Sequence, residues 1–134
     1  MPKKIRVGVV GTGFGRYHMD GFTQLQDVEL LAVCDLNVPE AQHFADKFGA
    51  QYVFEKYNEM FAMDELDAVS IAVPNYLHKP MTLEALKKGK HVLIEKPMAV
   101  TPADAREMAA AAKKAGKRLM VEQAMRFTEE AQML

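Results

Sequence analysis

Short apolar runs alternate with helix-like patterns along the chain, and this alternation restricts the fold more than any other feature of the sequence. The runs are nearly continuous in Val, Ile and Leu, which is typical of strands buried on both faces of a parallel sheet. Six runs are predicted as strands, the third being the weakest: residues 5–10, 28–34, 51–54, 68–73, 91–94 and 119–121. Repeated strand–helix units favour right-handed βαβ connections, so we predict an α/β fold, a doubly wound parallel sheet of about six strands with helices on both faces.

The segments between the predicted strands carry helical periodicity and helix-end signals. Apolar and small residues recur at helical spacing at positions 14, 18, 22 and 25, at 41, 44, 45 and 48, and at 105, 108, 109 and 112. Asn37 and Thr101 each precede an acidic residue by three positions and predict helix N-caps. Lysines before Gly89 and Gly116 predict helix C-termini, because cations suit the negative end of the helix dipole.

Composition excludes several classes of protein. The 134 residues include 17 basic and 18 acidic side chains, and this balance argues against a nucleic acid or an anionic membrane as the main partner. The single cysteine, Cys34, excludes an internal disulfide and favours a reducing, cytoplasmic setting. The apolar runs are too short to span a bilayer, and the basic start lacks the apolar core of a signal peptide. We also expect no metal site.

A glycine-rich turn follows the first predicted strand and opens the first helix; it comprises Gly11, Thr12, Gly13, Phe14 and Gly15. One glycine permits the tight turn, and another lets the backbone approach a pyrophosphate at the positive end of the helix dipole. In this position the turn predicts a dinucleotide site. The third glycine of G-x-G-x-x-G would fall at Arg16, one residue later than it does here. Arg16 either reaches a phosphate or is solvated.

Asp35 closes the second predicted strand, 22 residues after Gly13. An acid at this place accepts hydrogen bonds from the adenosine ribose and repels a 2′-phosphate. The next residues, Leu36, Asn37 and Val38, include no arginine that could bind such a phosphate. We therefore predict that NAD is preferred over NADP, with Asp35 and Leu36 at the cofactor. The alternative is that Asp35 is a loop or capping residue.

Two further segments follow later strands: Val73-Pro74-Asn75-Tyr76-Leu77-His78 and Glu95-Lys96-Pro97. Together with the glycine turn and Asp35, they resemble the glucose–fructose oxidoreductase/inositol dehydrogenase (Gfo/Idh/MocA) family. The NAD(P)-binding Rossmann domain of that family carries these segments in this order, and Arg126-Phe127 matches a later family element. The resemblance covers essentially the whole chain. Proline after a sharp strand exit also makes the Lys96–Pro97 bond a candidate for the cis form.

The resemblance implies hydride transfer between NAD(P) and a sugar, a cyclitol or a related hydroxyl or carbonyl substrate. It implies that Pro74, Asn75 and His78 line the cofactor. It also implies that Lys96, next to Glu95, is the catalytic residue that reaches the reacting hydroxyl. Read from the residues alone, Asn75 also suits a turn after proline and His78 the first turn of a helix. An ion pair between Glu95 and Lys96 is the alternative for the lysine, although adjacent strand residues point to opposite faces.

His18, on the first predicted helix, shares a face with Phe14 and Phe22. This placement favours packing or a structural polar contact over catalysis.

Residues 1–122 are assigned to the dinucleotide-binding domain, and residues 123–134 to the start of a connection to a substrate domain that this sequence does not contain. By the resemblance, that domain holds the small-molecule substrate, so we expect this chain alone to bind cofactor without turnover. Apolar residues in the last ten positions, Met125, Phe127, Met133 and Leu134, predict self-association into a homo-oligomer.

Two other functions stay open. A non-catalytic dinucleotide-binding or regulatory module is disfavoured by Lys96 standing in its motif. An S-adenosylmethionine-dependent methyltransferase is disfavoured because the first strand has no acidic residue before Gly11 and the Glu95-Lys96-Pro97 segment would be unexplained.

Overall fold

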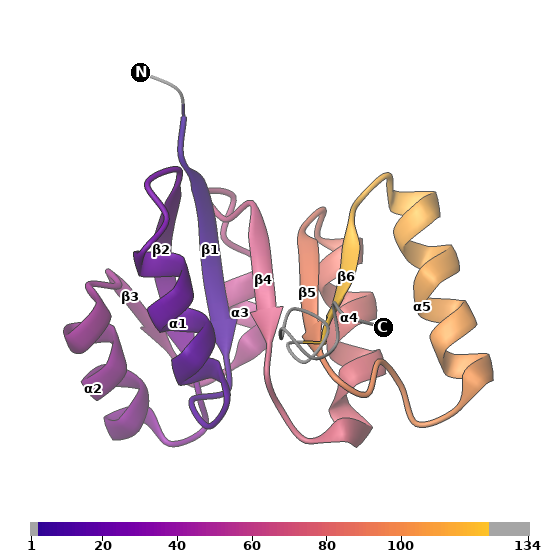
Figure 1. The fold of residues 1–134 in the computed structure, drawn as a ribbon, viewed down its shortest axis with the longest axis horizontal. Helices are drawn as coiled ribbons and strands as arrows, with labels where there is room; N and C mark the ends of the chain where they lie inside the picture. The colour runs from indigo at the N-terminus through magenta and orange to yellow at the C-terminus, as the bar shows by residue number, and fades with distance from the viewer. Residues whose placement is uncertain (1–2, 124–134) are drawn as a thin grey trace, which may run out of the picture.

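The computed structural model describes residues 3–123 and contains a six-stranded sheet in the order β3-β2-β1-β4-β5-β6 (Figure 1). Its strands are β1 (Ile5–Val10), β2 (Val28–Cys34), β3 (Tyr52–Phe54), β4 (Ala68–Ile71), β5 (His91–Glu95) and β6 (Leu119–Glu122). Every neighbouring pair is parallel, which confirms the predicted fold class. Arg126 and the terminal apolar residues Met125, Phe127, Met133 and Leu134 lie outside the described residues.

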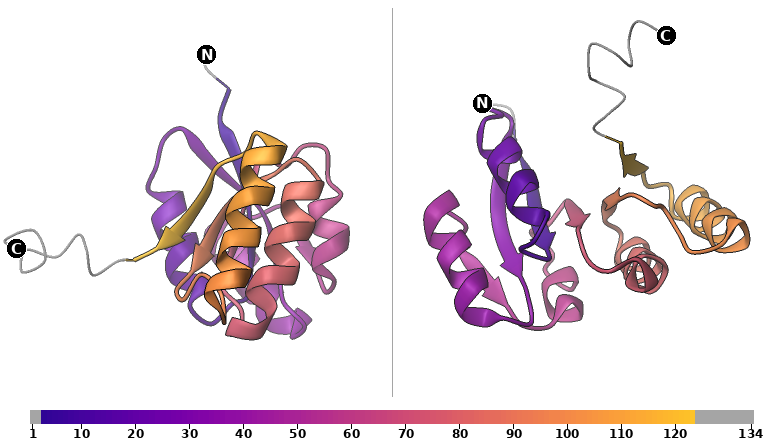
Figure 2. Two further views of the ribbon diagram at one scale, coloured as in Figure 1. Left: turned by 90° about the vertical axis from the view of Figure 1, so that its right-hand side faces the viewer. Right: turned by 60° about the horizontal axis from the view of Figure 1, so that its bottom comes forward.

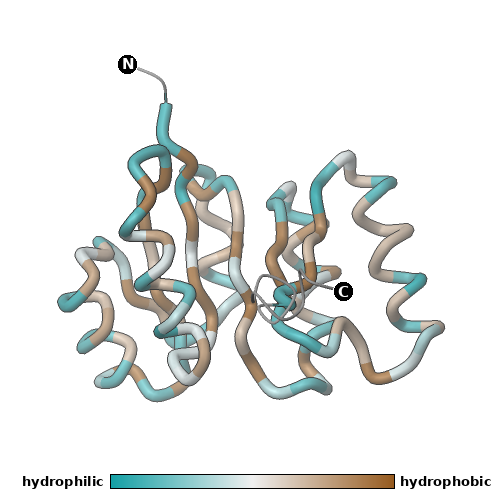
Figure 3. Tube along the Cα trace, in the orientation of Figure 1, coloured by the Kyte–Doolittle hydropathy of each residue, from teal (hydrophilic) through white to brown (hydrophobic). Residues whose placement is uncertain are grey.

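Helices cover both faces of the sheet (Figure 2). They are α1 (Gly15–Thr23), α2 (Val38–Phe48), α3 (Tyr57–Phe61), α4 (His78–Lys87) and α5 (Pro102–Ala115), with a short 3-10 turn, Asn75–Leu77, before α4. The α1 and α2 helices contribute Met19, Ala41 and Phe44 to one buried cluster, and the other face has its own cluster with α3, α4 and α5. Hydrophobic residues concentrate along the strands between these layers (Figure 3). Within the described residues, no helix is both long and apolar enough to cross a membrane.

The predicted helix ends agree with the structure at the caps. The Asn37 side chain accepts a hydrogen bond from the Glu40 amide at 3.1 Å, and the Thr101 hydroxyl accepts one from the Asp104 amide at 3.1 Å. Gly116 follows α5 with a φ of 67°, in the left-handed region that favours glycine. The α3 helix was not predicted, because its five residues are too few to show helical periodicity.

The α1 helix turns only part of its predicted face to the core, where Phe22 packs against the buried cluster. Gly15 and Met19 are buried, whereas Phe14 is 70% and Leu25 54% exposed. A Cβ atom on Gly15 would lie 2.9 Å from Cγ1 of Val9, so the glycine permits the helix to approach β1 closely. The predicted apolar face also borders a groove of about 500 Å³ between α1 and the β5–β6 edge.

Candidate functional site

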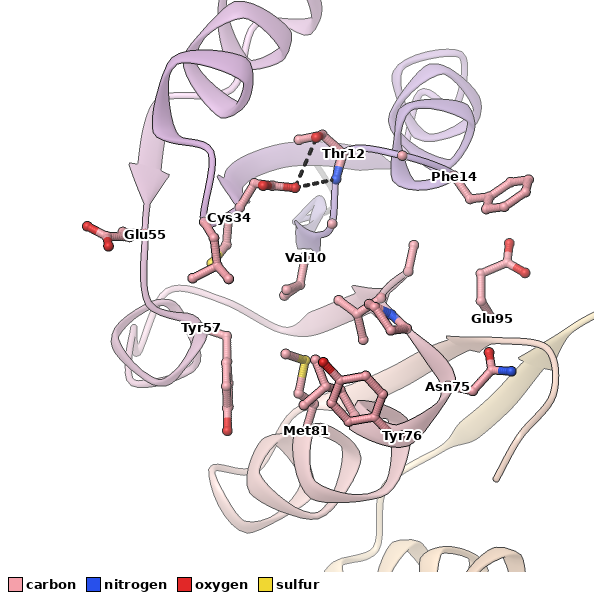
Figure 4. Close-up of a pocket in the computed structure, with 18 of the residues that line it drawn as sticks. Val10, Thr12, Phe14, Cys34, Glu55, Tyr57, Asn75, Tyr76, Met81 and Glu95 are labelled. Atoms are coloured by element: carbon pink, nitrogen blue, oxygen red, sulfur yellow. Dashed lines mark hydrogen bonds between the residues drawn. The ribbon is translucent and has the colours of Figure 1, made fainter. Parts of the chain in front are cut away.

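A cleft of about 780 Å³ opens beyond the carboxyl ends of β1, β2, β4 and β5, where open α/β sheets bind their ligands. Predicted site residues from four separate loops line it: Gly11, Thr12, Gly13, Phe14, Asp35, Leu36, Pro74, Asn75, Glu95 and Lys96. Phe14, Asn75 and Glu95 lie on one side of the cleft, and Glu55 and Tyr57 lie on the other (Figure 4). Of the predicted residues, Gly15 and His78 do not line it.

The three glycines of the turn meet different steric requirements. Gly11 has a φ of 92°, and a Cβ atom there would lie 2.1 Å from the carbonyl oxygen of Ala72. A Cβ atom on Gly13 would meet no protein atom within 4 Å, so the backbone is open on this side. Gly15 allows the contact between α1 and β1. The third glycine therefore serves close helix–strand packing at position 15, and position 16 does not require a glycine.

Asp35 is held between the glycine turn and the start of α2. One carboxylate oxygen accepts hydrogen bonds from the Thr12 amide at 2.9 Å and from the Thr12 hydroxyl at 3.0 Å, drawn as dashed lines in Figure 4. The other oxygen accepts a bond from the Asn37 amide at 2.8 Å. The bond from the Asn37 amide is a local loop contact, as expected if Asp35 is a loop residue. The Thr12 contacts also fix the carboxylate at the wall of the cleft, beside the turn.

Arg16 is 43% exposed and also makes several contacts with protein groups. Its Nε atom donates to the carbonyl oxygens of Thr12 at 3.0 Å and Gly13 at 2.9 Å. Its Nη2 atom lies 3.3 Å from Oε1 of Glu40, and the guanidinium stacks over the Phe44 ring, 4.9 Å from its centroid. The side chain is thus bound by protein groups at the junction of α1 and α2.

A buried polar chain connects α1 to the end of β5. His18 Nδ1 is hydrogen-bonded to the Ser70 hydroxyl, and His18 Nε2 lies 2.7 Å from Oε1 of Glu95. The other Glu95 oxygen accepts the Lys96 amide at 3.2 Å. A ring protonated at Nε2, with the Ser70 hydroxyl donating to Nδ1, satisfies every member of this chain. His18 therefore makes the structural polar contact that its position predicts, and Glu95 orients the backbone at Lys96.

Lys96 is exposed at the wall of the cleft. The alternative ion pair with Glu95 does not form, because the Glu95 carboxylate is turned toward His18. Among residues 3–123, the Lys96 ammonium makes no ion pair. The Lys96–Pro97 bond is cis, in agreement with the sequence. The amine is thus available to a molecule in the cleft.

His78 lies behind the cleft wall rather than in it. It is the first residue of α4 and is fully buried. Its Nδ1 atom is 2.7 Å from the Pro97 carbonyl oxygen, and its Nε2 atom is 2.9 Å from the Val73 carbonyl oxygen. The ring therefore ties the loop that carries Asn75 to the loop that carries Lys96. This placement agrees with the alternative of a helix-start residue, and a direct contact between His78 and the cofactor stays a prediction.

Sequence reasoning missed several residues of the cleft. Glu55 reaches it from the loop after β3, the strand with the weakest sequence signal, and Tyr57 reaches it from the first position of α3. Cys34 also lines it, and burial, reinforced by the negative charge of Asp35, raises the pKa of its thiol to about 12. The thiol is therefore neutral near pH 7 and is a poor nucleophile. The described residues contain no group of three or more acidic, His or Cys side chains placed to hold a metal ion.

Comparison with known proteins yields related dehydrogenases. The chain is 39% identical over 132 residues to a D-glucoside 3-dehydrogenase of Escherichia coli strain K12, spanning 97% of this chain and 38% of that protein. It is 39% identical over 126 residues to a scyllo-inositol 2-dehydrogenase (NADP(+)) of Bacillus subtilis strain 168, spanning 92% and 38% respectively. The crystal structure of GenD2 from gentamicin A biosynthesis in complex with NAD has a TM-score of 0.91 at 32% identity, covering 96% of this chain and 37% of that one.

The chain thus spans about 40% of the length of these proteins, and the matched region includes the whole cleft. Residues 5–123 also match the model of the GFO_IDH_MocA family, described as "Oxidoreductase family, NAD-binding Rossmann fold". The match begins at β1 and ends just after β6, so it contains the glycine turn, Asp35 and the Glu95-Lys96-Pro97 segment. The chain belongs to the Gfo/Idh/MocA oxidoreductase family, and residues 5–123 are its NAD-binding Rossmann fold.

Proposed function

We propose that this chain binds NAD(H) in the cleft as the cofactor domain of an oxidoreductase that acts on a sugar, a cyclitol or a related hydroxyl or carbonyl compound. The observation that carries the proposal is the meeting of the glycine turn and Lys96 in one cleft at the carboxyl ends of the strands. Membership of the family supports a nicotinamide cofactor. The names of the two curated relatives, a D-glucoside 3-dehydrogenase and a scyllo-inositol 2-dehydrogenase (NADP(+)), support the reaction and the substrate class but not the choice of NAD over NADP.

The cleft of about 780 Å³ is lined by loops that follow four strands, which suits a dinucleotide. The Gly13 backbone, which has open space beside it at the N-terminus of α1, would receive the pyrophosphate. Asp35 and Leu36 would lie at the adenosine ribose, and Asn75 and Pro74 at the nicotinamide half. Asn75 offers both a donor and an acceptor, which suits a carboxamide or a ribose hydroxyl. Gly15 and His78 would act indirectly, by shaping the turn and the two loops.

The preference for NAD over NADP rests on Asp35. Its carboxylate is held by hydrogen bonds from Thr12 and Asn37, and within residues 3–123 it makes no ion pair. A ribose hydroxyl can donate to it, whereas a 2′-phosphate would be repelled.

Lys96 is proposed as the residue that moves the proton of the substrate hydroxyl. Bound nicotinamide supplies the hydride chemistry, and the protein must accept or return a proton at the substrate oxygen. Two observations support this role: the Lys96 side chain makes no ion pair within residues 3–123, and Glu95 accepts the Lys96 backbone amide. A neutral amine there would accept the hydroxyl proton in oxidation, and an ammonium would return it in reduction. The substrate itself would be held by a second domain outside residues 1–134, since the matched relatives are more than twice as long.

Calorimetric titration of this chain with NADH, NADPH and S-adenosylmethionine tests the cofactor proposal. We expect one site per chain, tighter binding of NADH than of NADPH, and no binding of S-adenosylmethionine. Tighter binding of NADPH would overturn the preference, and binding of S-adenosylmethionine alone would overturn the function. Dehydrogenase turnover of a polyol by this chain alone would overturn the assignment of the substrate site to another domain.

A further inference from the structure

Arg16 and Asp35 are anchored to the same residue of the glycine turn. The Asp35 carboxylate accepts the amide and hydroxyl of Thr12, and the Arg16 Nε atom donates to the Thr12 carbonyl oxygen. A guanidinium and a carboxylate are thus bonded to the same residue of the cleft wall, Thr12, next to the place where the proposed ribose would lie. The guanidinium is not free, because its Nη2 atom is paired with Glu40 at 3.3 Å.

We propose that Arg16 and Glu40 form a second determinant of cofactor selectivity, in which Glu40 withholds from a 2′-phosphate a guanidinium that could otherwise bind it. The inference rests on the proposed function and extends it. NADP sites use an arginine near the ribose, where NAD sites use an acid. This chain carries both an acid, Asp35, and an arginine, Arg16. The ion pair with Glu40 would keep Arg16 from binding a 2′-phosphate, so that the cofactor contacts Asp35.

The chemistry of the two side chains supports this assignment. A guanidinium presents its donors in a planar fork that matches phosphate oxygens. The Nε atom of Arg16 is committed to the turn carbonyls, so only its terminal nitrogens can reach a ligand, and Glu40 occupies one of them. Asp35 and Glu40 together outweigh the single positive charge of Arg16, which leaves the rim negative. Neutralising Glu40 would both free the fork and remove that excess.

The placement of Glu40 is fixed independently of its charge. Glu40 lies in the first turn of α2, and its amide is capped by the Asn37 side chain at 3.1 Å. Its Oε2 atom accepts a hydrogen bond from the side-chain Nδ2 atom of Asn37 at 3.4 Å. The Arg16 and Glu40 side chains are 43% and 36% exposed. They do not line the cleft themselves, but Arg16 is hydrogen-bonded to Thr12 and Gly13, which do. Glu40→Gln keeps the shape and the backbone cap and changes only the charge.

The test compares dissociation constants of this chain for NADH and NADPH, measured by nicotinamide fluorescence. We expect Glu40→Gln to lower the ratio of the NADPH constant to the NADH constant about three- to tenfold, through tighter NADPH binding. The gain should shrink at high salt, because the exposed charges are screened. Glu107→Gln is the matched control. Glu107 is an acid on α5 that is ion-paired with Lys79 of α4 at 2.7 Å, and its substitution should leave the ratio unchanged.

The double variant Arg16→Gln/Glu40→Gln assigns the effect to the guanidinium. We expect its ratio to return to that of the unmodified chain, and taking a ratio cancels any general loss of affinity from a looser turn. An unchanged ratio in Glu40→Gln, or a gain that persists in the double variant, would overturn the inference while leaving NADH binding intact. Failure of the unmodified chain to bind NADH would instead remove the proposed function, and this inference with it.

Discussion

Substitution of Gly13 should separate cofactor binding from folding. A Cβ atom at Gly13 meets no protein atom within 4 Å, and its φ is not positive, so Gly13→Val should change the free energy of unfolding by less than about 0.5 kcal/mol. The valine would fill the space through which the backbone approaches the pyrophosphate. Losing one or two charge-assisted hydrogen bonds at about 1.5–3 kcal/mol each should weaken NADH binding at least about tenfold.

Gly11→Val is the matched control for this experiment. The same side chain at Gly11 meets the Ala72 carbonyl oxygen at 2.1 Å and must adopt a φ of 92°. Backbone strain of about 1–3 kcal/mol and overpacking of about 1–3 kcal/mol should together cost about 2–6 kcal/mol. Urea denaturation measures the free energy of unfolding of both variants, and NADH fluorescence measures the dissociation constant of Gly13→Val for NADH. Unchanged affinity in Gly13→Val would show that the anion binds elsewhere and would refute the reasoning.

Further outcomes are expected at three residues, Asp35, His18 and Cys34. Asp35→Ser should narrow the preference for NADH over NADPH in the same titration, and an unchanged preference would separate Asp35 from the ribose. His18→Ala should lower the free energy of unfolding in urea by about 1–3 kcal/mol, because buried Ser70 loses its partner and Glu95 its donor; an equally stable variant would contradict this. The Cys34 thiol should resist iodoacetamide at pH 8 in the folded chain. Because burial raises its pKa from 9.0 to about 12, the stability it contributes is complete below pH 9 and is lost as the pH rises toward 12, which urea denaturation across that range would check.

The fold could be predicted from the sequence because its signals are local and agree with one another. Buried parallel strands appear as continuous apolar runs, and the caps at Asn37 and Thr101 mark helix starts with their own side chains. The glycine turn and the strand ends could be placed together because parallel strands end at one edge of the sheet.

The remaining site features depend on contacts that the sequence does not encode locally. Arg16 is bound by Glu40, 24 residues later, and His78 by the Pro97 carbonyl, 19 residues later. Periodicity grouped Phe14 with the apolar face of α1, but Gly15 brings the neighbouring face against β1. The buried face of α1 is therefore set by the small residue that lets the helix approach β1, and not by the larger apolar side chain of Phe14.

The central claim is that a dinucleotide lies in this cleft, with its pyrophosphate at the glycine turn and its nicotinamide near Lys96. Amide chemical shifts of the isotopically labelled chain, recorded during titration with NADH, test it most directly. We predict that the largest changes fall on Gly13, Asn75 and Lys96, with smaller changes near Asp35. Changes confined to the groove between α1 and β5, around Leu93, would contradict the account.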